Sequence, residues 1–492
     1  MISSECETLA RTGGLGDVTL QLSRALARLG HHALVVTPLY GVTRLPRPVS
    51  AWRDEVEVRV GWGPGDVRRV RVLELERETA PSGGTLRIAL VDDAALFGGR
   101  AGIYGDARGT FGDNEYRFAT LSRAGLEIGA RAWLAEGGRE PDVIHAHDWH
   151  AAFAIIQGKR AMGDGWRRRP FVLSIHNLAY QGVFGAELLD PLGIPREIFH
   201  AACMEQMGAA SALKAAIALA DAITTVSPTY AREITTPEGG FGLDGHLRGH
   251  AHRLVGIANG IETDRYDPRA DPAIACTYDE RTASVGKARC KDALAGELGL
   301  APGGGPLIAA VSRLVWQKGI DLLLACAPRL AERGARVVLV GQGEAALEDR
   351  LRQLAARWPG RIAARIQFDE GLARRVYSAS DFVAVPSRFE PCGLVQLYAM
   401  RYGAVPVVTR VGGLADTVAP IDAARATGTG LFADAPTAQA LADALDRAVA
   451  LHASAPALAA ARARAMTADV GWAAPAARYV EVYERAAAIA AR

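Results

Sequence analysis

The second half of the chain places two cations at a spacing that suits a diphosphate. Arg313 and Lys318 stand five residues apart in the segment 312–319 (SRLVWQKG), which follows an apolar run and opens a helical pattern. From the end of a strand both side chains can reach one ligand, and two cations complement two phosphate groups. A solvated surface pair is the alternative interpretation, especially for Arg313. Lys318 is more informative, because the 56 basic residues include only five lysines, at positions 159, 214, 287, 291 and 318.

A carboxylate follows another apolar run, in the segment 386–394 (PSRFEPCGL). Glu390 at this position can accept hydrogen bonds from sugar hydroxyls or balance a developing positive charge. Capping of the following helix is an equally weighted alternative. Cys392 is most simply a small packed residue.

The first half carries a polar cluster in the segment 145–150 (HAHDWH). Its first two histidines alternate along a strand and share one face, as metal ligands could. No second group of ligands at zinc spacing accompanies them, so we favour a sugar site over a metal site. Asp148 would bind hydroxyl groups and Trp149 the apolar face of a sugar ring. His176 and Asn177 end another predicted strand and are expected at the same cleft.

Two pairs of glycines stand between a predicted strand and a predicted helix. Gly13 and Gly14 belong to GGLGDV, and Gly412 and Gly413 to GGLADTV. Such a turn exposes backbone N–H groups at the positive end of a helix, where phosphate binds readily. Either pair alone is explained by a tight turn. The two together favour a phosphorylated ligand in a cleft between two doubly wound domains.

These residues are positioned by alternating short apolar runs and amphipathic segments, a pattern typical of parallel α/β sheets. A glycine-rich segment at 97–113 is predicted as a loop over a sheet edge. We predict strands at 33–37, 86–91, 143–147, 171–176, 222–226, 307–312, 336–340, 362–368, 382–386 and 405–409, and helices at 15–29, 320–333, 344–358, 372–380 and 394–402.

The pattern predicts two domains. Residues 1–258 form a first Rossmann-like domain, and residues 281–470 form a second one. Residues 259–280 are poorly periodic and rich in Asp, Arg and Pro, which favours a linker. Residues 471–492 form a helix that packs back on the first domain.

Composition excludes several classes of protein. The 492 residues are 49% hydrophobic and 22% charged with a net charge of +2, which excludes a mainly disordered chain and argues against a nucleic-acid or polybasic membrane partner. No apolar run approaches membrane-spanning length, and no basic-then-apolar segment opens the chain, so we expect a cytoplasmic protein. The six cysteines show no metal spacing, which favours reduced thiols.

The motifs as a set resemble those of bacterial glycogen synthases and plant starch synthases. They run in that family's order from residue 3 to residue 418 and cover most of the chain. The segments are 11–18, HAHDWH, SIHNLAYQG (174–182), VSPTYAREI (226–234), NGI (259–261), SRLVWQKG, PSRFEPCGL and GGLADTV.

The resemblance implies the GT-B fold, in which two Rossmann-like doubly wound domains face each other across a cleft. It implies that the domain of residues 1–258 lies on the acceptor side and that the domain of residues 281–470 binds the nucleotide sugar. It implies transfer of glucose from ADP-glucose to the non-reducing end of an α-1,4-glucan, with retention of the anomeric configuration and without metal or cofactor. A synthase that uses UDP-glucose or makes a short oligosaccharide is one alternative. A glucan-binding relative that has lost catalysis is another.

The resemblance also implies roles for individual residues. Arg313 and Lys318 would hold the donor diphosphate, and Glu390 would hold the glucose. The backbone carbonyl of His176 would lie near the reacting carbon, and Asp148 would bind glucose or acceptor. The remaining positions of the motifs are assigned to substrate binding: Arg11, Gly13, Gly14, Asn177, Trp149, Asn259, Phe368, Cys392, Gly393, Leu394 and Thr417. Among these, Gly14 and Thr417 would contact phosphate, and the Phe368 ring would stack on the base.

The chain departs from the family in two places. The family has Lys where this chain has Arg11, whose longer, forked side chain changes the predicted donor contact. Only four residues precede Glu5, so we expect a short first strand. No carboxylate pair at a strand end points to a double-displacement nucleophile, which favours front-side attack within an ion pair.

Overall fold

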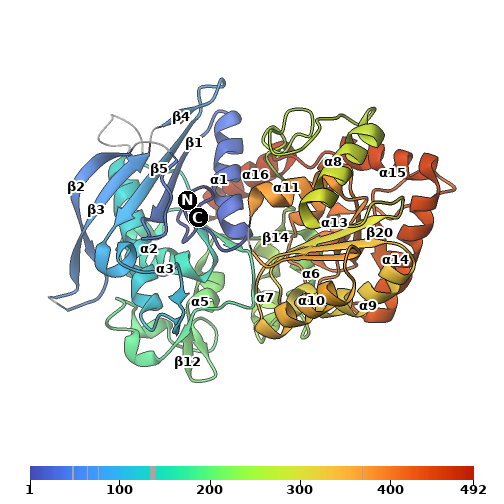
Figure 1. Cartoon of the computed structure of the whole chain (residues 1–492). Coiled ribbons are helices and arrows are strands. Elements are labelled where there is room, and N and C mark those ends of the chain that lie inside the picture. The colour runs from blue at the N-terminus through green and yellow to red at the C-terminus, as the bar shows by residue number, and fades with distance from the viewer. Residues whose placement is uncertain (47–48, 64, 76, 133–139, 368, 492) are drawn as a thin grey trace. The chain divides into compact units, whose positions relative to one another are not determined.

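The computed structural model describes residues 1–46, 49–63, 65–75, 77–132, 140–367 and 369–491. The chain divides into two compact units (Figure 1). The first unit consists of Met1–Ile257 and Trp472–Arg492, and the second of Ala258–Gly471.

The second unit is built on a sheet of six parallel strands in the order β17-β16-β15-β18-β19-β20. In chain order this is 3-2-1-4-5-6, the order of the Rossmann fold. Its strands are β15 (Leu307–Val311), β16 (Arg336–Val340), β17 (Ile362–Arg365), β18 (Phe382–Val385), β19 (Val405–Thr409) and β20 (Leu431–Ala433). The order reverses between β15 and β18, and we call the carboxyl ends of these two strands the second-unit switch point.

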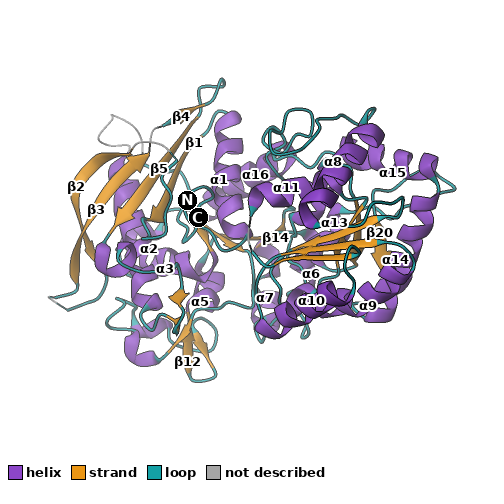
Figure 2. Ribbon diagram, in the orientation of Figure 1, coloured by secondary structure: helices purple, strands orange, loops and turns teal. Residues whose placement is uncertain are grey.

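Helices cover both faces of this sheet because side chains alternate along each strand. Val337 and Leu339 of β16 pack with α9, α10 and α14, whereas Val338 and Val340 pack with α8, α11, α12 and α15. Figure 2 shows the sheet between these two groups. The helices are α8 (Ala283–Leu298), α9 (Ile320–Glu332), α10 (Ala345–Arg357), α11 (Glu370–Ala379), α12 (Val395–Arg401), α13 (Gly412–Thr417), α14 (Ala438–Ala453) and α15 (Ala455–Thr467).

The first unit contains two groups of strands that a single residue joins. One group has the order β1-β5-β3-β2 with β4 beside β5, and the other has the order β14-β13-β9-β8. Ile2 forms parallel bridges to Val36 of β1 and to Ala146 of β8. The strands are β1 (His32–Pro38), β2 (Val49–Arg59), β3 (Val67–Leu75), β4 (Glu78–Thr79), β5 (Thr85–Asp92), β8 (Ile144–His147), β9 (Phe171–Ile175), β13 (Ala222–Thr225) and β14 (Leu254–Gly256).

When Ile2 is counted as the first strand, the parallel strands of this sheet lie in the order β5-β1-Ile2-β8-β9-β13-β14. Numbered along the chain, the first six of these strands have the order 3-2-1-4-5-6, as in the second unit. The short first strand is held on both sides by backbone hydrogen bonds. Ile2 N donates to His145 O at 2.9 Å, and Ser3 N donates to Val36 O at 3.1 Å. The carboxyl ends of the Ile2 bridge and of β8 form the first-unit switch point.

The C-terminal helix belongs to the first unit. Helices α1 and α16 share a core with Val172 of β9 and Ala222 of β13. The indole N–H of Trp472 also donates to Gln21 Oε1 of α1 at 2.9 Å. The helices of this unit are α1 (Gly14–Arg28), α2 (Asn114–Ala132), α3 (Asp148–Arg160), α4 (Asp164–Arg167), α5 (Ala212–Leu219), α6 (Pro228–Glu233), α7 (Asp244–Gly249) and α16 (Ala473–Ala490).

Two segments differ from the simple expectation. The predicted linker 259–280 is part of the second unit, because Ile261, Tyr266, Ile274 and Tyr278 are buried in its core. The glycine-rich loop contains a small hairpin of β6 (Gly105–Asp106) and β7 (Gly109–Thr110). The first unit also contains a three-stranded sheet, formed by β10 (Val183–Phe184), β11 (Glu205–Gln206) and β12 (Ala209–Ser211).

In the described parts of the chain, no helix combines the length and the hydropathy that a membrane span requires.

Candidate active site

Lys318 and Glu390 meet at the second-unit switch point. Lys318 follows β15 and Glu390 follows β18, and Lys318 Nζ lies 2.5 Å from Glu390 Oε2. The Ser387 hydroxyl donates to the same oxygen at 2.8 Å. Glu390 is only 5% exposed, whereas Lys318 is half-buried, so the carboxylate is shielded from water and the ammonium remains partly accessible. An ammonium has three N–H donors and a carboxylate two oxygens, so both groups keep capacity for a ligand.

The loops that carry these two residues are joined by their backbones. Arg388 N donates to Gln317 O at 2.9 Å, and Gln317 Nε2 donates to Phe389 O at 3.3 Å. Gly319 permits the approach, because a Cβ atom there would lie 2.0 Å from Pro386 O, and its φ of +63° is unfavourable for other residues. Backbone groups and the Gln317 side chain therefore hold the two loops together and keep Lys318 next to Glu390.

The second glycine pair packs against the Glu390 loop. Gly413 N donates to Glu390 O at 3.0 Å, and a Cβ atom at residue 413 would lie 2.1 Å from Cys392 O. Gly393 has a φ of +71°, which glycine tolerates best. The Thr417 hydroxyl donates to Gly413 O at 2.6 Å. A phosphate contact from this hydroxyl would replace that bond, and the phosphate role of Thr417 stays a prediction.

Other residues singled out in the second unit surround this cluster. Arg313 is exposed, and its guanidinium makes a long contact of 3.4 Å to Gln317 Oε1. Asn259 is buried and forms hydrogen bonds to Cys392, while burial raises the pKa of the Cys392 thiol to about 12. Leu394 is half-buried and directly precedes α12. Cys392 is thus an uncharged packed residue.

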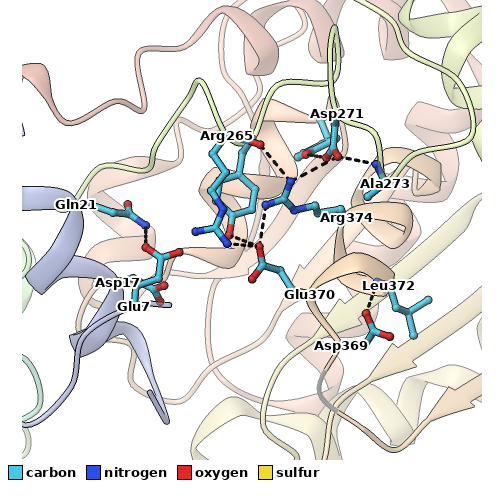
Figure 3. A network of polar contacts seen from close by, with 12 residues as sticks. Glu7, Asp17, Gln21, Arg265, Asp271, Ala273, Asp369, Glu370, Leu372 and Arg374 are labelled. Atoms are coloured by element: carbon cyan, nitrogen blue, oxygen red, sulfur yellow. Dashed lines mark hydrogen bonds and ion pairs between the residues drawn. The ribbon is translucent and has the colours of Figure 1, made fainter. Parts of the chain in front are cut away.

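Phe368, the predicted base-stacking residue, lies outside the described residues. Helix α11 begins shortly after it, and Glu370 Oε1 accepts hydrogen bonds from Arg265 Nη2 and Arg374 Nη2, both at 2.7 Å (Figure 3). Arg374 Nη1 also contacts Asp271 Oδ1 at 3.5 Å. These contacts tie the start of α11 to the segment that contains Arg265 and Asp271.

In the first unit, Asp148 holds the end of β9. Its Oδ1 accepts a hydrogen bond from His176 N at 2.7 Å and a weaker one from Asn177 N at 3.4 Å. Asp148 has a φ of +56°, a strained conformation for a non-glycine residue that often marks a functional site. Burial raises the pKa of Asp148 to about 7, although the two backbone hydrogen bonds oppose the shift.

The histidines of this region are buried and uncharged at neutral pH. His147 Nδ1 lies 3.0 Å from His176 Nε2. Burial lowers the pKa of His176 to about 3 and lowers the pKa values of His145 and His147 well below the usual range. Over the described ranges, no set of three or more His, Cys, Asp or Glu side chains is arranged to hold a metal ion.

Trp149 packs against the loop that follows His176. A Cβ atom at Gly182 would lie 2.4 Å from the indole, and the Phe118 and His150 rings lie 5.3 Å and 4.3 Å from it, centroid to centroid. Protein atoms therefore occupy part of the indole surface. Stacking of a sugar on Trp149 stays a prediction.

The first glycine-rich turn is organised by Glu5, which the sequence patterns did not single out. Glu5 Oε2 accepts hydrogen bonds from Thr12 N at 2.7 Å and Gly13 N at 3.2 Å, and Oε1 accepts one from the Tyr104 hydroxyl at 2.6 Å. The Gly13 amide is thus already bonded. Gly14 is exposed and is the first residue of α1, at the positive end of the helix.

Arg11 lies close to two carboxylates of its own unit. Its Nη1 forms an ion pair with Asp17 and lies 3.6 Å from Glu7 Oε1. Glu7 also accepts a hydrogen bond from Gln21 Nε2 at 2.7 Å (Figure 3). Burial raises the pKa of Asp17 to about 7, and the Arg11 charge opposes that shift. A contact between Arg11 and a donor stays a prediction.

Ser387, Glu5 and Tyr104 are site residues that sequence reasoning missed. Glu5 and Ser387 shared one detectable signal, because each is a polar residue just beyond a strand at a switch point. Tyr104 gave no such signal, since it reaches Glu5 from the glycine-rich segment, 99 positions along the chain.

Comparisons with known proteins identify relatives over the whole chain. Residues 1–249 match the family described as starch synthase catalytic domain, and residues 305–450 match the family described as glycosyl transferases group 1. Glycogen synthases from Myxococcus xanthus and Rhodospirillum rubrum are each 41% identical. The alignments cover 98% of this chain, and 98% and 97% of the respective relatives.

Solved structures give the same picture. The catalytic domain of starch synthase IV from Arabidopsis thaliana, bound to ADP and acarbose, is 30% identical with a TM-score of 0.89, covering 99% of this chain and 98% of its own. Sucrose-phosphate synthase from Thermosynechococcus elongatus is 20% identical with a TM-score of 0.58, covering 99% of this chain and 97% of its own, and shares the fold.

Proposed function

Because the chain belongs to the glycogen synthase and starch synthase family of glycosyltransferases, we propose that it transfers glucose from ADP-glucose to the non-reducing end of an α-1,4-glucan. The transfer retains the anomeric configuration and requires no metal ion. The first unit binds the acceptor, and the second unit binds the nucleotide sugar.

The Lys318–Glu390 pair at the second-unit switch point is the observation that carries this proposal. Ligands of doubly wound sheets bind outside the carboxyl ends of the strands, at the point where the strand order reverses. The pair brings a cation and a carboxylate together at that point, 2.5 Å apart. A nucleoside diphosphate sugar needs both, because its diphosphate is anionic and its sugar offers hydroxyl groups.

The cations assist the leaving group. When the bond between the anomeric carbon and the diphosphate oxygen breaks, negative charge grows on the diphosphate. Lys318 and the exposed Arg313 stabilise that charge, as preorganised donors do in other active sites. Glu390, which accepts a hydrogen bond from the Ser387 hydroxyl, holds the Lys318 ammonium in place before the donor binds. These side chains supply the positive charge that a metal ion would otherwise provide.

The acceptor attacks from the face that the diphosphate leaves. The acceptor hydroxyl forms the new bond to the anomeric carbon, and its proton passes to the departing diphosphate oxygen. Asp148 is an unfavourable nucleophile for double displacement, because its Oδ1 accepts a hydrogen bond from His176 N and because burial raises its pKa to about 7, so that much of it keeps its proton at neutral pH. Asp148 acts instead by fixing the backbone of His176, whose carbonyl oxygen we expect to lie near the reacting carbon.

A transfer assay tests the proposal. Labelled ADP-glucose and UDP-glucose are each incubated with glycogen primer, with and without EDTA, and the Lys318→Ala variant serves as the impaired control. We expect label from ADP-glucose to enter the glucan equally in both buffers. Preference for UDP-glucose would overturn the donor assignment. Loss of activity in EDTA with recovery in Mg²⁺ would overturn the metal-free mechanism.

A further inference from the structure

His145 is held by contacts to both of its ring nitrogens near the end of β8. Its Nδ1 lies 3.0 Å from the Tyr483 hydroxyl of α16, and its Nε2 lies 2.7 Å from Ser174 Oγ. Ser174 Oγ in turn lies 2.5 Å from Thr224 Oγ1. Each of these hydroxyl groups can donate or accept, so the contacts hold the His145 ring in place whichever nitrogen carries its proton.

His147 lies beside His145 and bonds to a different residue. The two rings have centroids 4.1 Å apart, so His145 restrains the plane of the His147 ring. His147 Nδ1 lies 3.0 Å from His176 Nε2, and in the described parts of the chain no group bonds the buried His147 Nε2. Because both rings are neutral, one of them donates in the His147–His176 bond and the other accepts.

The surroundings of His147 Nε2 indicate which of the two residues donates in the His147–His176 hydrogen bond. If His147 carried its proton on Nε2, a buried N–H would lack an acceptor. If it carries the proton on Nδ1, only a lone pair lacks a donor. Buried N–H groups without an acceptor are rarer in proteins than under-satisfied acceptors. His147 therefore donates from Nδ1, and His176 accepts at Nε2.

We propose that His147 is a positioning residue that holds His176 in the Nδ1–H tautomer, so that His176 offers an uncharged N–H donor to a sugar hydroxyl oxygen. The tautomer follows from contacts within the first unit. Its use toward a sugar rests on the function proposed above. A hydroxyl that accepts from His176 keeps its own hydrogen for a second partner, which the opposite tautomer would prevent.

Register explains how two consecutive residues fix His176. Strands β8 and β9 pair in parallel, with His147 opposite Ser174, and His176 lies on the same face two residues further along. His147 bonds the His176 ring, and Asp148 bonds the His176 backbone amide. The strained φ of Asp148 directs its side chain to that amide, while His147 keeps an extended conformation. Together they restrain both ends of the residue.

Nitrogen NMR of the full-length protein labelled with ¹⁵N-histidine tests the tautomer directly. A His176→Asn variant assigns the resonances. We expect a protonated Nδ1 and an unprotonated Nε2 for His176 in the ligand-free wild-type protein at neutral pH. Protonation at Nε2 would overturn the proposal, and this measurement does not depend on the folding of any His147 variant.

Three variants test the role of His147. His147→Asn keeps an N–H donor near the position of Nδ1, and His147→Leu removes that donor. Tyr483→Phe removes only the neighbouring hydroxyl group. We expect His147→Leu to mix the two His176 tautomers and lower kcat by about tenfold with a smaller change in KM. His147→Asn should keep the tautomer and most of kcat, and Tyr483→Phe should keep the tautomer.

The outcomes separate this inference from the proposed function. An unchanged His176 tautomer in His147→Leu would overturn the positioning role. Mixed tautomers with unchanged kcat would confirm the positioning role and overturn the use of the His176 N–H in glucosyl transfer.

Discussion

The two units share a strand order but place different chemistry at the switch point. In the second unit the carboxylate of Glu390 faces the Lys318 ammonium. In the first unit the carboxylate of Asp148 faces the backbone amide of His176, beside uncharged histidines. The topology thus provides the location, whereas the side chains determine the chemistry there: a charged pair in the second unit and neutral polar groups in the first.

The difference also changes what each carboxylate contributes to stability. Glu390 is buried beside a cation that compensates its charge. Asp148 is buried with hydrogen bonds to neutral amides, and its pKa is about 7. A buried charge without a counter-ion is unfavourable, so Asp148 favours its protonated form. Burial of the carboxylate therefore destabilises the folded protein more at Asp148 than at Glu390.

The largest effect is expected from breaking the charged site. Lys318→Ala should lower kcat by ~10²-fold or more, because it removes a preorganised charge from the leaving group. Arg313→Ala should act in the same direction. Steady-state kinetics with ADP-glucose provide the measurement, and circular dichroism checks the fold.

A structural lysine is the matched control for this prediction. Lys159 pairs with Asp221 and donates to the carbonyl oxygens of Arg167 and Arg169. Lys159→Ala should lower the free energy of unfolding and leave kcat of the folded protein unchanged. Near-wild-type kcat for both Lys318→Ala and Arg313→Ala would refute the diphosphate assignment.

A smaller effect is expected from Arg11 in the first unit. Arg11→Ala should reduce kcat/KM for ADP-glucose by an amount on the order of 1–3 kcal/mol, as for the loss of a hydrogen bond to a charged group. Arg11→Lys should retain or raise activity, since the cation beside Asp17 is kept. Arg108→Ala, at an exposed pair with Asp106, is the neutral control. If Arg11→Ala matches the wild type, Arg11 serves only its own carboxylates.

Neutralising Asp148 is expected to act on stability, through its pH dependence, and not on the kinetics with ADP-glucose that the other variants test. The folded protein holds the Asp148 proton more tightly than the unfolded chain does. Stability therefore falls as pH rises from about 4 to about 7, and the loss is complete above that range. Asp148→Asn cannot ionise, so relative to the wild type it should gain roughly 2–4 kcal/mol of stability between pH 4 and pH 8.

Urea denaturation at several pH values measures this difference. Asp17 titrates in the same direction in both proteins, so only the difference between them reports on Asp148. Asp349→Asn on the surface of α10 should show no such gain. A pH-independent difference between wild type and Asp148→Asn would contradict the buried, weakly compensated carboxylate.

Much of the fold could be predicted from local patterns, and the α/β class and the family are confirmed. Strand β16 and the boundaries of α9 and α10 were predicted to within one residue or so, because hydrophobic periodicity is a local property. The segment 259–280 was misjudged because its four buried apolar residues follow no period. Its burial depends on contacts with helices far along the chain.

The sequence by itself determined which residue types stand at strand ends, among them Lys318, Glu390 and Asp148, since an apolar run followed by a polar motif is visible in one dimension. Only the tertiary structure decided which of them meet. Lys318 and Glu390 are 72 positions apart, and they touch because β15 and β18 are neighbours in the sheet. Asp148 faces a backbone amide because β8 lies beside β9. Spacing along the chain cannot encode these pairings, because the order of strands in a sheet is set by packing between distant segments.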